Sequence, residues 1–237
     1  MSDNQFPGRC YSKRALPGDT FDLGIELEYS YAKEAKNYSR KLGVYHPSSL
    51  HPQACRRALY YDRIGITPKR SSSFKARKLF KLGHIIHDGI QATLEKMFPG
   101  FEPEPVIAFE ALNIYGHADG VLREKDWVIE LKSIGDASYK VLVKPQKKHL
   151  WQVTCYMAAL DIPRTQLLYI NRNTGDMRLF RVRFDVEIWE QIVQIIRETE
   201  AAVTEGVAPL GLNKSYTCRQ CKFKHHCEPI CLTETHS

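Results

Sequence analysis

The stretch GHADGVLREKDWVIELK, residues 116–132, carries the pattern that decides the fold. Its second half alternates apolar and polar residues, which predicts a β-strand with Glu130 and Lys132 on one face and apolar side chains on the other. A hairpin-like return of the chain between Asp119 and Glu130 brings their carboxylates side by side. The sequence therefore predicts two acidic side chains and a lysine at one point of a sheet.

Two carboxylates that converge on one point repel each other unless a cation joins them, and such hard oxygen ligands suit Mg²⁺ or Mn²⁺. An adjacent lysine can orient or deprotonate a metal-bound water, or stabilise charge on an attacked phosphate. The alternative is a chance arrangement, because an Asp and a Glu-x-Lys also occur on the solvent face of ordinary antiparallel hairpins.

Hydrophobic periodicity elsewhere predicts one mixed α/β domain with helices around a central sheet. Helices are expected over 79–94, 145–160 and 185–203, and strands over 106–111, 112–115, 117–122, 127–132, 166–170 and 177–184. A serine-capped helix is expected to begin near Pro47 and to carry Cys55, and strict alternation predicts a further strand over 21–31.

Two helix faces add polar groups to the acidic site. Gly83 and His87 are four residues apart, as are Gln152 and Tyr156, so each pair shares one helix face. His87 is a candidate nitrogen ligand. The alternatives are a packed or exposed histidine and a hydrogen-bonded surface pair.

The chain has 237 residues, a formal net charge of +7 and a sequence pI of about 9.0. This basic charge favours a polyanionic partner, with nucleic acid the leading candidate. The alternative is that the charge serves solubility alone. Two basic clusters precede the helices that carry His87 and Gln152, and phosphate neutralisation is their expected use. A purely solvated face is the alternative. The candidate DNA-binding residues in them are Arg70, Lys75, Arg77, Lys78, Lys147 and Lys148. Aromatic residues beside these clusters, such as Phe80, can stack on bases or belong to the core.

No run of about 18 apolar residues and no apolar signal core is present, so a soluble protein in the cytoplasm is expected, without membrane association. Seven cysteines in a reducing compartment indicate metal binding rather than disulfides. Cys218, Cys221 and Cys227 are closely spaced and Cys55 is the best distant fourth ligand. Four thiolates suit zinc or a [4Fe–4S] cluster, and a local zinc site completed by Cys231, His225 or His226 is also open.

The order Gly83-x-x-x-His87, Asp119, Glu130-x-Lys132, Gln152-x-x-x-Tyr156 resembles the RecB-like branch of the PD-(D/E)XK nuclease superfamily, with Ala118 in place of the proline. The resemblance implies a restriction-endonuclease-like core in which His87, Asp119 and Glu130 bind Mg²⁺ or Mn²⁺. It implies that Lys132 is the catalytic lysine and that Gln152 and Tyr156 position the substrate and that lysine.

The cysteine pattern is similar to that of the iron–sulfur nucleases, which include the CRISPR-associated adaptation exonucleases and AddB-type nuclease subunits. This resemblance implies a [4Fe–4S] cluster on Cys55, Cys218, Cys221 and Cys227 that fastens the C-terminal segment to the N-terminal helix. The expected organisation is an N-terminal extension over 1–46, a nuclease core over 47–205 and a cysteine-cluster segment over 206–237.

The sequence thus predicts a metal-dependent DNA exonuclease acting on single strands or DNA ends, with 5′→3′ polarity suggested by the CRISPR-associated group. Recombination, repair and CRISPR adaptation in a prokaryote or phage are all compatible settings, with a helicase, integrase or annealing protein as partner. The rivals are a non-catalytic DNA-binding scaffold subunit and a zinc-stapled endonuclease.

Overall fold

The computed structural model describes residues 23–24, 27, 29–30, 41–69, 74–212, 218–219 and 221–231. The chain divides into two units, Met1–Tyr38 and Ser39–Ser237. In the first unit the described residues, among them Leu23, Leu27 and Tyr29, are helical and exposed, so the strand predicted over 21–31 is wrong there. Leu23 and Leu27 are four residues apart, a spacing that fits a helical period as well as a period of two.

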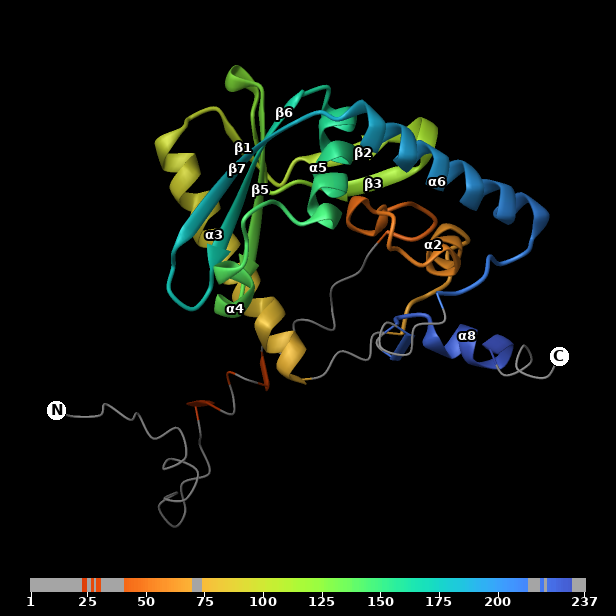
Figure 1. Ribbon diagram of the computed structural model, residues 1–237. Helices are drawn as coiled ribbons and strands as arrows, with labels where there is room; N and C mark the ends of the chain where they lie inside the picture. Colours follow the sequence, from red (N-terminus) through yellow and green to blue (C-terminus); the bar gives the residue numbers. More distant parts are fainter. Residues whose placement is uncertain are drawn as a thin grey trace, which may run out of the picture. The chain divides into compact units, whose positions relative to one another are not determined.

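A five-stranded mixed sheet of order β1-β4-β5-β6-β7 forms the centre of the second unit (Figure 1). The strands are β1 (Phe101–Pro103), β4 (Gly120–Leu122), β5 (Trp127–Ile134), β6 (Arg164–Asn171) and β7 (Met177–Arg183). Only β5 and β6 pair in parallel, and the other neighbours pair antiparallel. A separate two-stranded sheet pairs β2 (Val106–Phe109) with β3 (Ile114–His117).

Helices cover both faces of the central sheet, as predicted for an α/β fold (Figure 1). Helix α3 (Phe74–Met97) packs Ile86, Ile90 and Leu94 on one face, against Ile129 and Leu131 of β5. Helix α5 (Lys147–Leu160) packs on the other face, with Val153 and Met157 in a cluster with Val128. Because β5 is sandwiched between two helices, alternate residues of the strand serve two different cores.

The crossover from β5 to β6 runs through α4 (Asp136–Lys140) and α5. Parallel strands need such a long connection, and this one places the start of α4 directly after β5 and brings Gln152, in the middle of α5, to Glu130 of β5. Helix α6 (Val186–Glu205) then packs on α5, capped by the Asp185 carboxylate, which accepts from the Ile188 N–H at 3.1 Å. Short 3₁₀ turns among the described residues are η2 (Pro47–Ser49), η3 (Glu110–Leu112) and η4 (Arg123–Lys125).

The helix expected from Pro47 is divided in two. After η2 the chain turns, and α2 (Arg56–Arg63) begins only behind Cys55, which is its N-cap rather than a residue within the helix. The interruption falls at His51-Pro52, because a residue before proline disfavours the helical region.

The C-terminal segment lies against α2. Phe223 is fully buried with Tyr60 and Tyr61, and α8 (Lys224–Cys231) follows it. Lys222 Nζ binds both carboxylate oxygens of the buried Asp62, at 2.5 and 2.8 Å. These contacts join residues about 160 positions apart in the chain. No helix among the described residues is long and apolar enough to span a membrane.

Candidate active site

The predicted acidic pair lies side by side at the pairing of two strands. Asp119 directly precedes β4, and β4 pairs antiparallel with β5, which carries Glu130 and Lys132. Ile129 and Leu131 belong to the core cluster on the α3 side, as the alternation predicted. Glu130 is only 2% exposed. The return of the chain between the two acids is therefore the one that the sequence predicted.

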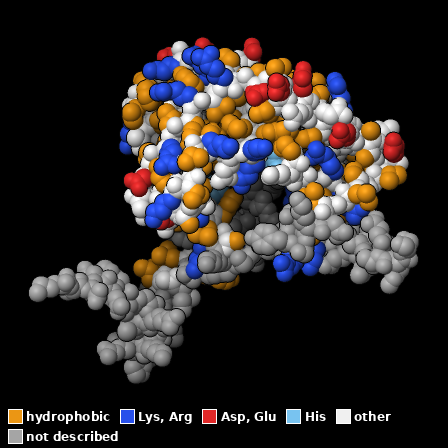
Figure 2. All heavy atoms as spheres, viewed as in Figure 1, with side chains coloured by type: hydrophobic (Ala, Val, Ile, Leu, Met, Phe, Trp, Pro, Cys, Tyr) orange, Lys and Arg blue, Asp and Glu red, His pale blue; other side chains and the backbone are white. Residues whose placement is uncertain are grey.

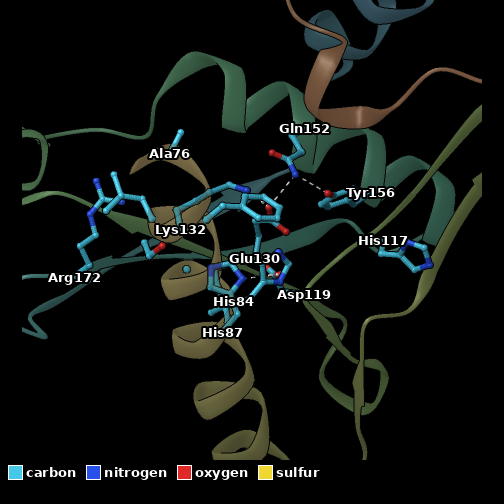
Figure 3. Close-up of a pocket in the computed structure, with 15 residues that line it drawn as sticks. Ala76, His84, His87, His117, Asp119, Glu130, Lys132, Gln152, Tyr156 and Arg172 are labelled. Atoms are coloured by element: carbon cyan, nitrogen blue, oxygen red, sulfur yellow. Dashed lines mark hydrogen bonds and ion pairs between the residues drawn. The ribbon is translucent and has the colours of Figure 1, made fainter. Parts of the chain in front are cut away.

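These side chains line one cavity of about 570 Å³ together with groups from both helices (Figure 3). Helix α3 contributes Gly83, His84 and His87, β5 contributes Glu130 and Lys132, and α5 contributes Gln152 and Tyr156. All six residues expected to form the catalytic and metal set reach this cavity, namely His87, Asp119, Glu130, Lys132, Gln152 and Tyr156. In the orientation of Figure 1, the space-filling view of Figure 2 shows a hollow with Lys and Arg side chains along the described part of its rim.

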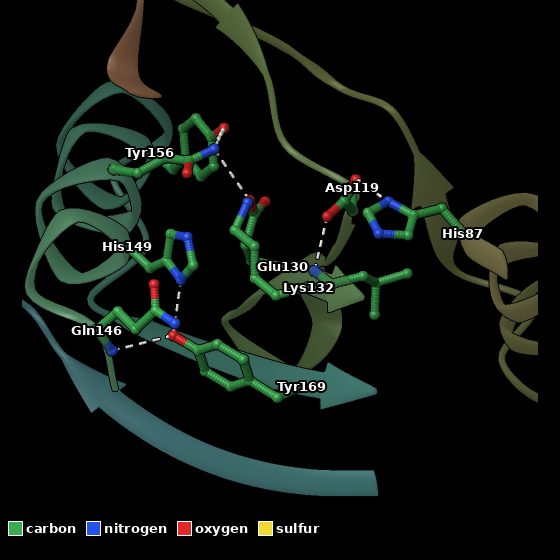
Figure 4. A network of polar contacts seen from close by, with 10 residues as sticks. His87, Asp119, Glu130, Lys132, Gln146, His149, Tyr156 and Tyr169 are labelled. Atoms are coloured by element: carbon green, nitrogen blue, oxygen red, sulfur yellow. Dashed lines mark hydrogen bonds and ion pairs between the residues drawn. The ribbon is translucent and has the colours of Figure 1, made fainter. Parts of the chain in front are cut away.

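Asp119 is held by two donors. His87 Nδ1 lies 3.2 Å from Asp119 Oδ1, and the Leu131 N–H donates to Asp119 Oδ2 at 2.6 Å (Figure 4). Burial alone would raise the pKa of Asp119, but the hydrogen bond from His87, the charges of His87 and Lys132 and the Leu131 N–H together hold it below its usual value. Asp119 is therefore a carboxylate at neutral pH.

Glu130 behaves in the opposite way. Burial, and then the negative charge of Asp119, raise the pKa of Glu130 to about 8, although Lys132 opposes the shift. Lys132 Nζ and Gln152 Nε2 both donate to Glu130 Oε1, the amide at 2.9 Å. Gln152 Nε2 also lies 2.6 Å from Tyr156 Oη, and burial raises the pKa of that phenol. One oxygen of Glu130 thus orders the lysine and the Gln152–Tyr156 pair.

The donor chemistry of His87, Asp119 and Glu130 fits a divalent cation. An imidazole and two converging carboxylates are suitable ligands, and a positive ion would relieve the repulsion that raises the pKa of Glu130. In the described ranges, however, no three His, Cys, Asp or Glu side chains form a group that already holds metal-binding geometry. Here Glu130 is turned toward Lys132 and Gln152 instead.

The cysteine candidates lie at the N-cap of α2 and in the C-terminal segment, and in the described residues no three of them form a group with metal-binding geometry. Cys55, Cys218, Cys221 and Cys227 are all half-buried free thiols. Burial raises the pKa of Cys221, with further contributions from Cys55 and Cys218, and burial together with Cys221 and Cys55 raises the pKa of Cys227. Cys221 therefore lies within electrostatic range of Cys55, Cys218 and Cys227, although the sequence separates Cys55 from Cys218 by 163 positions.

The DNA-binding candidates are only partly described. Arg77 and Lys78 lie half-buried in the first turns of α3, next to Ala76, which lines the cavity, and Lys147 and Lys148 are exposed in the first turn of α5. Arg70 and the side chain of Lys75 lie outside the described residues.

Sequence reasoning missed several cavity-lining residues, among them three with basic side chains. His84 lies one turn before His87 on α3, His117 ends β3, and Arg172 follows β6. Helical spacing from His87 would have found His84, whereas no local signal connects Arg172 with the acidic pair.

A profile of the PD-(D/E)XK nuclease superfamily matches residues 76–228. The chain belongs to this superfamily. The match begins on α3 and includes every residue assigned to the cavity, which supports a nuclease. PD-(D/E)XK nucleases typically use Mg²⁺ or Mn²⁺.

Solved structures share the fold. The structure is similar to the crystal structure of SSO0001, with a TM-score of 0.55 and 19% identity over 88% of this chain and 98% of that chain. It is also similar to the alkaline exonuclease LHK-Exo from Laribacter hongkongensis, with a TM-score of 0.54 and 14% identity over 75% of this chain and 95% of that chain. The structure of LHK-Exo in complex with dAMP has a TM-score of 0.54 and 16% identity, over 75% of this chain and 95% of that chain. No curated protein matches the sequence significantly.

Proposed function

We propose that this PD-(D/E)XK protein is a metal-dependent DNA exonuclease that hydrolyses phosphodiester bonds of single-stranded DNA or DNA ends. The observation that carries the proposal is the meeting of Asp119, Glu130 and Lys132 with His87 and Gln152 in one cavity. Each of these groups has a place in phosphodiester hydrolysis, and they come from four separate segments of the chain. The net charge of +7 also favours a polyanionic substrate.

His87, Asp119 and Glu130 are the residues that would hold Mg²⁺ or Mn²⁺, which supplies a water of lowered pKa and polarises a phosphate oxygen. Lys132 keeps a positive charge beside the attacked phosphate, where charge develops in the transition state. Gln152 and Tyr156 act on Lys132 through Glu130, because the amide holds the carboxylate oxygen that the ammonium group also binds. They are positioning residues.

The preference for DNA ends and the 5′→3′ polarity rest on resemblance. The cysteine pattern is similar to that of the CRISPR-associated exonucleases, and one of the similar structures is an alkaline exonuclease. Recombination, repair or CRISPR adaptation in a prokaryote or phage is the proposed setting. A helicase, integrase or strand-annealing protein is the proposed partner.

We further propose a [4Fe–4S] cluster on Cys55, Cys218, Cys221 and Cys227, which would fasten the proposed C-terminal segment, beginning near residue 206, to α2. The mutual electrostatic influence of these thiols supports it, because thiolates that repel one another gain from a shared cation. Protein purified without oxygen should be brown, absorb near about 400 nm and contain equal iron and acid-labile sulfide. Cys221→Ala should lose both, whereas Cys155→Ala, at a buried cysteine of α5, should keep them. Zinc without iron in the wild type would contradict the cluster.

The test of the activity is digestion of 5′-labelled and 3′-labelled single-stranded DNA with Mn²⁺. The wild type should degrade the DNA, and Lys132→Ala and Asp119→Ala should reduce the rate by at least about 10²-fold, as removal of a transition-state contact does. Asp126→Ala, which removes an exposed carboxylate close to β5, is the matched control and should remain active. The order in which the labels are released gives the polarity.

Inactivity of all four proteins, with salt-sensitive DNA binding retained, would favour the scaffold subunit over the enzyme.

A further inference from the structure

We infer that Arg172 is a phosphate-binding residue that anchors a non-scissile phosphate of the DNA strand in the catalytic cavity. The inference rests on the proposed nuclease function and adds a substrate contact to it. It comes from the β6–β7 connection, which the sequence pattern explained only as a turn.

Arg172 reaches the cavity from a part of the chain far from the acidic motif. The parallel pairing of β5 and β6 sets Ile134 opposite Asn171, so the residue after Asn171 lies at the end of the strand that carries Lys132. The Arg172 N–H donates to the Ile134 carbonyl at 3.0 Å. Figure 3 shows Arg172 on one side of Lys132, with Asp119 and His117 on the other.

The guanidinium group of Arg172 lies against Gly135, where the backbone leaves room for it. A Cβ at Gly135 would lie 3.3 Å from Arg172 Nη2, so the absence of a side chain at Gly135 lets the group lie against the β5–α4 junction. Arg172 is half-buried there and lines the cavity.

The turn that carries Arg172 is tied to α4 on both sides. Asn171 is 1% exposed, and its Nδ2 donates to Asp136 Oδ1 at 3.0 Å. The Asp136 N–H donates to Asn173 Oδ1 at 3.0 Å, and the Asn173 N–H donates to Asn171 Oδ1 at 3.1 Å. This closed ring of hydrogen bonds fixes the backbone on either side of Arg172. A side chain that binds from a fixed backbone loses less freedom on binding.

Arg172 has no acidic partner within the described part of the chain. The acids nearest to it in the turn and in α4 are already bound, since Asp136 pairs with Lys140 at 2.7 Å and Asp176 accepts from Thr174 Oγ1 at 2.6 Å. A half-buried guanidinium without a carboxylate has an unmet demand for an anion, and its planar fork matches the two oxygens of a phosphate.

The position indicates which phosphate is bound. Lys132 contacts Glu130 at the acidic end of the cavity, where the attacked phosphate has to meet the carboxylates. Arg172 stands at the other side of Lys132, away from both acids (Figure 3). A strand that places one phosphate at the acids therefore offers Arg172 a neighbouring phosphate.

The test is a phosphate scan by fluorescence anisotropy, with the intact chain and single-stranded DNA in which one linkage at a time is a neutral methylphosphonate. In the wild type, one linkage outside the cleaved bond should weaken binding about tenfold when neutralised, as loss of a charged hydrogen-bonded pair does. Arg172→Gln should bind unmodified DNA about tenfold more weakly than the wild type. Neutralising that one linkage should not weaken its binding further, while its response at every other linkage should match the wild type. Arg172→Lys should recover part of the affinity, because the charge remains while the fork is lost.

Arg181→Gln is the matched control, because it removes the same charge from an exposed position of the same hairpin. It should keep the wild-type scan. If Arg172→Gln, or Arg172→Lys where the former does not fold, keeps the wild-type affinity and the wild-type sensitivity at every linkage, the inference is overturned while cleavage by the wild type still supports the nuclease. If the wild type neither binds nor cleaves DNA, the inference falls with the proposed function.

Discussion

His149 makes the stability of this protein depend on pH in a way that can be isolated. The ring lies in α5, is 8% exposed, and its Nδ1 is 2.7 Å from Tyr169 Oη, which also accepts from the Gln146 N–H at 3.1 Å (Figure 4). Burial, and then the positive charges of Lys132 and Lys148 and the neighbouring His51, lower the pKa of His149 to about 3. The ring is therefore neutral in the folded protein and shares a hydrogen bond with the Tyr169 hydroxyl.

The magnitude follows from the difference between folded and unfolded states. An unfolded histidine has a pKa of about 6.5, so below that pH the unfolded chain binds a proton that the folded chain excludes. Stability is therefore lost as the pH falls from about 6.5 toward 3. At about pH 5 the loss is about 1.5 pH units at 1.36 kcal/mol each, or about 2 kcal/mol.

Urea denaturation at about pH 7.5 and about pH 5 measures the contribution of His149 to the free energy of unfolding when the wild type is compared with a His149 variant. Glu130 acts in the opposite direction in the same range, because its raised pKa favours the folded state at low pH, so only the comparison with His149→Asn isolates the histidine. The wild type should lose about 2 kcal/mol more than His149→Asn between the two pH values. His117→Gln, at an exposed histidine, should follow the wild type. Equal pH dependence in wild type and His149→Asn would refute the reasoning.

Three further outcomes test packing, attachment of the C-terminal segment and base contact. Gly120→Ala should destabilise the fold by about 1–3 kcal/mol in urea, because the added Cβ would lie 2.3 Å from the ring of the buried Phe101, and unchanged stability would contradict the packing. Asp62→Asn should speed proteolysis after Gly206 by weakening the ion pair that ties the C-terminal segment to α2, while equal cleavage rates would show that burial of the aromatic residues suffices. Phe80→Ala should weaken single-stranded DNA binding by about 1–3 kcal/mol per lost stacked base, because Phe80 lines the cavity and is 47% exposed, whereas Leu82→Ala, on the same helix but outside the cavity lining, should bind normally.

Hydrophobic periodicity was sufficient to predict the helices and strands that bury a broad apolar face. Helices α3, α5 and α6 lie where their apolar spacing predicts, and β5 divides its side chains between two cores as its alternation predicts. The sequence did not reveal β1 or α4, because three and five residues are too few to show a period. Their conformation depends on neighbours, since β1 exists through its pairing with β4.

The acidic site was predictable to the extent that its geometry is local. Asp119 and Glu130 are eleven residues apart, and a single return of the chain brings them together. The side chains that hold them come from farther away, since His87 contacts Asp119 and Gln152 donates to Glu130. Spacing on a helix gives the face of such residues, but only the packing of α3 and α5 on opposite faces of β5 shows that both faces meet one cavity.

The parallel pairing of β5 and β6 separates positive from negative charge along the cavity. Glu130 and Lys132 share one face of β5, and the strand continues past them to Ile134, whose carbonyl binds the Arg172 N–H. Negative charge therefore lies toward Asp119, positive charge lies toward Arg172, and Lys132 stands between them (Figure 3). A cation and a polyanion are attracted to opposite ends of such a site. Under the proposed function, a strand with phosphates in a row would thereby be oriented before any bond is broken, and the crossover that creates the parallel pair would be part of the substrate-binding machinery.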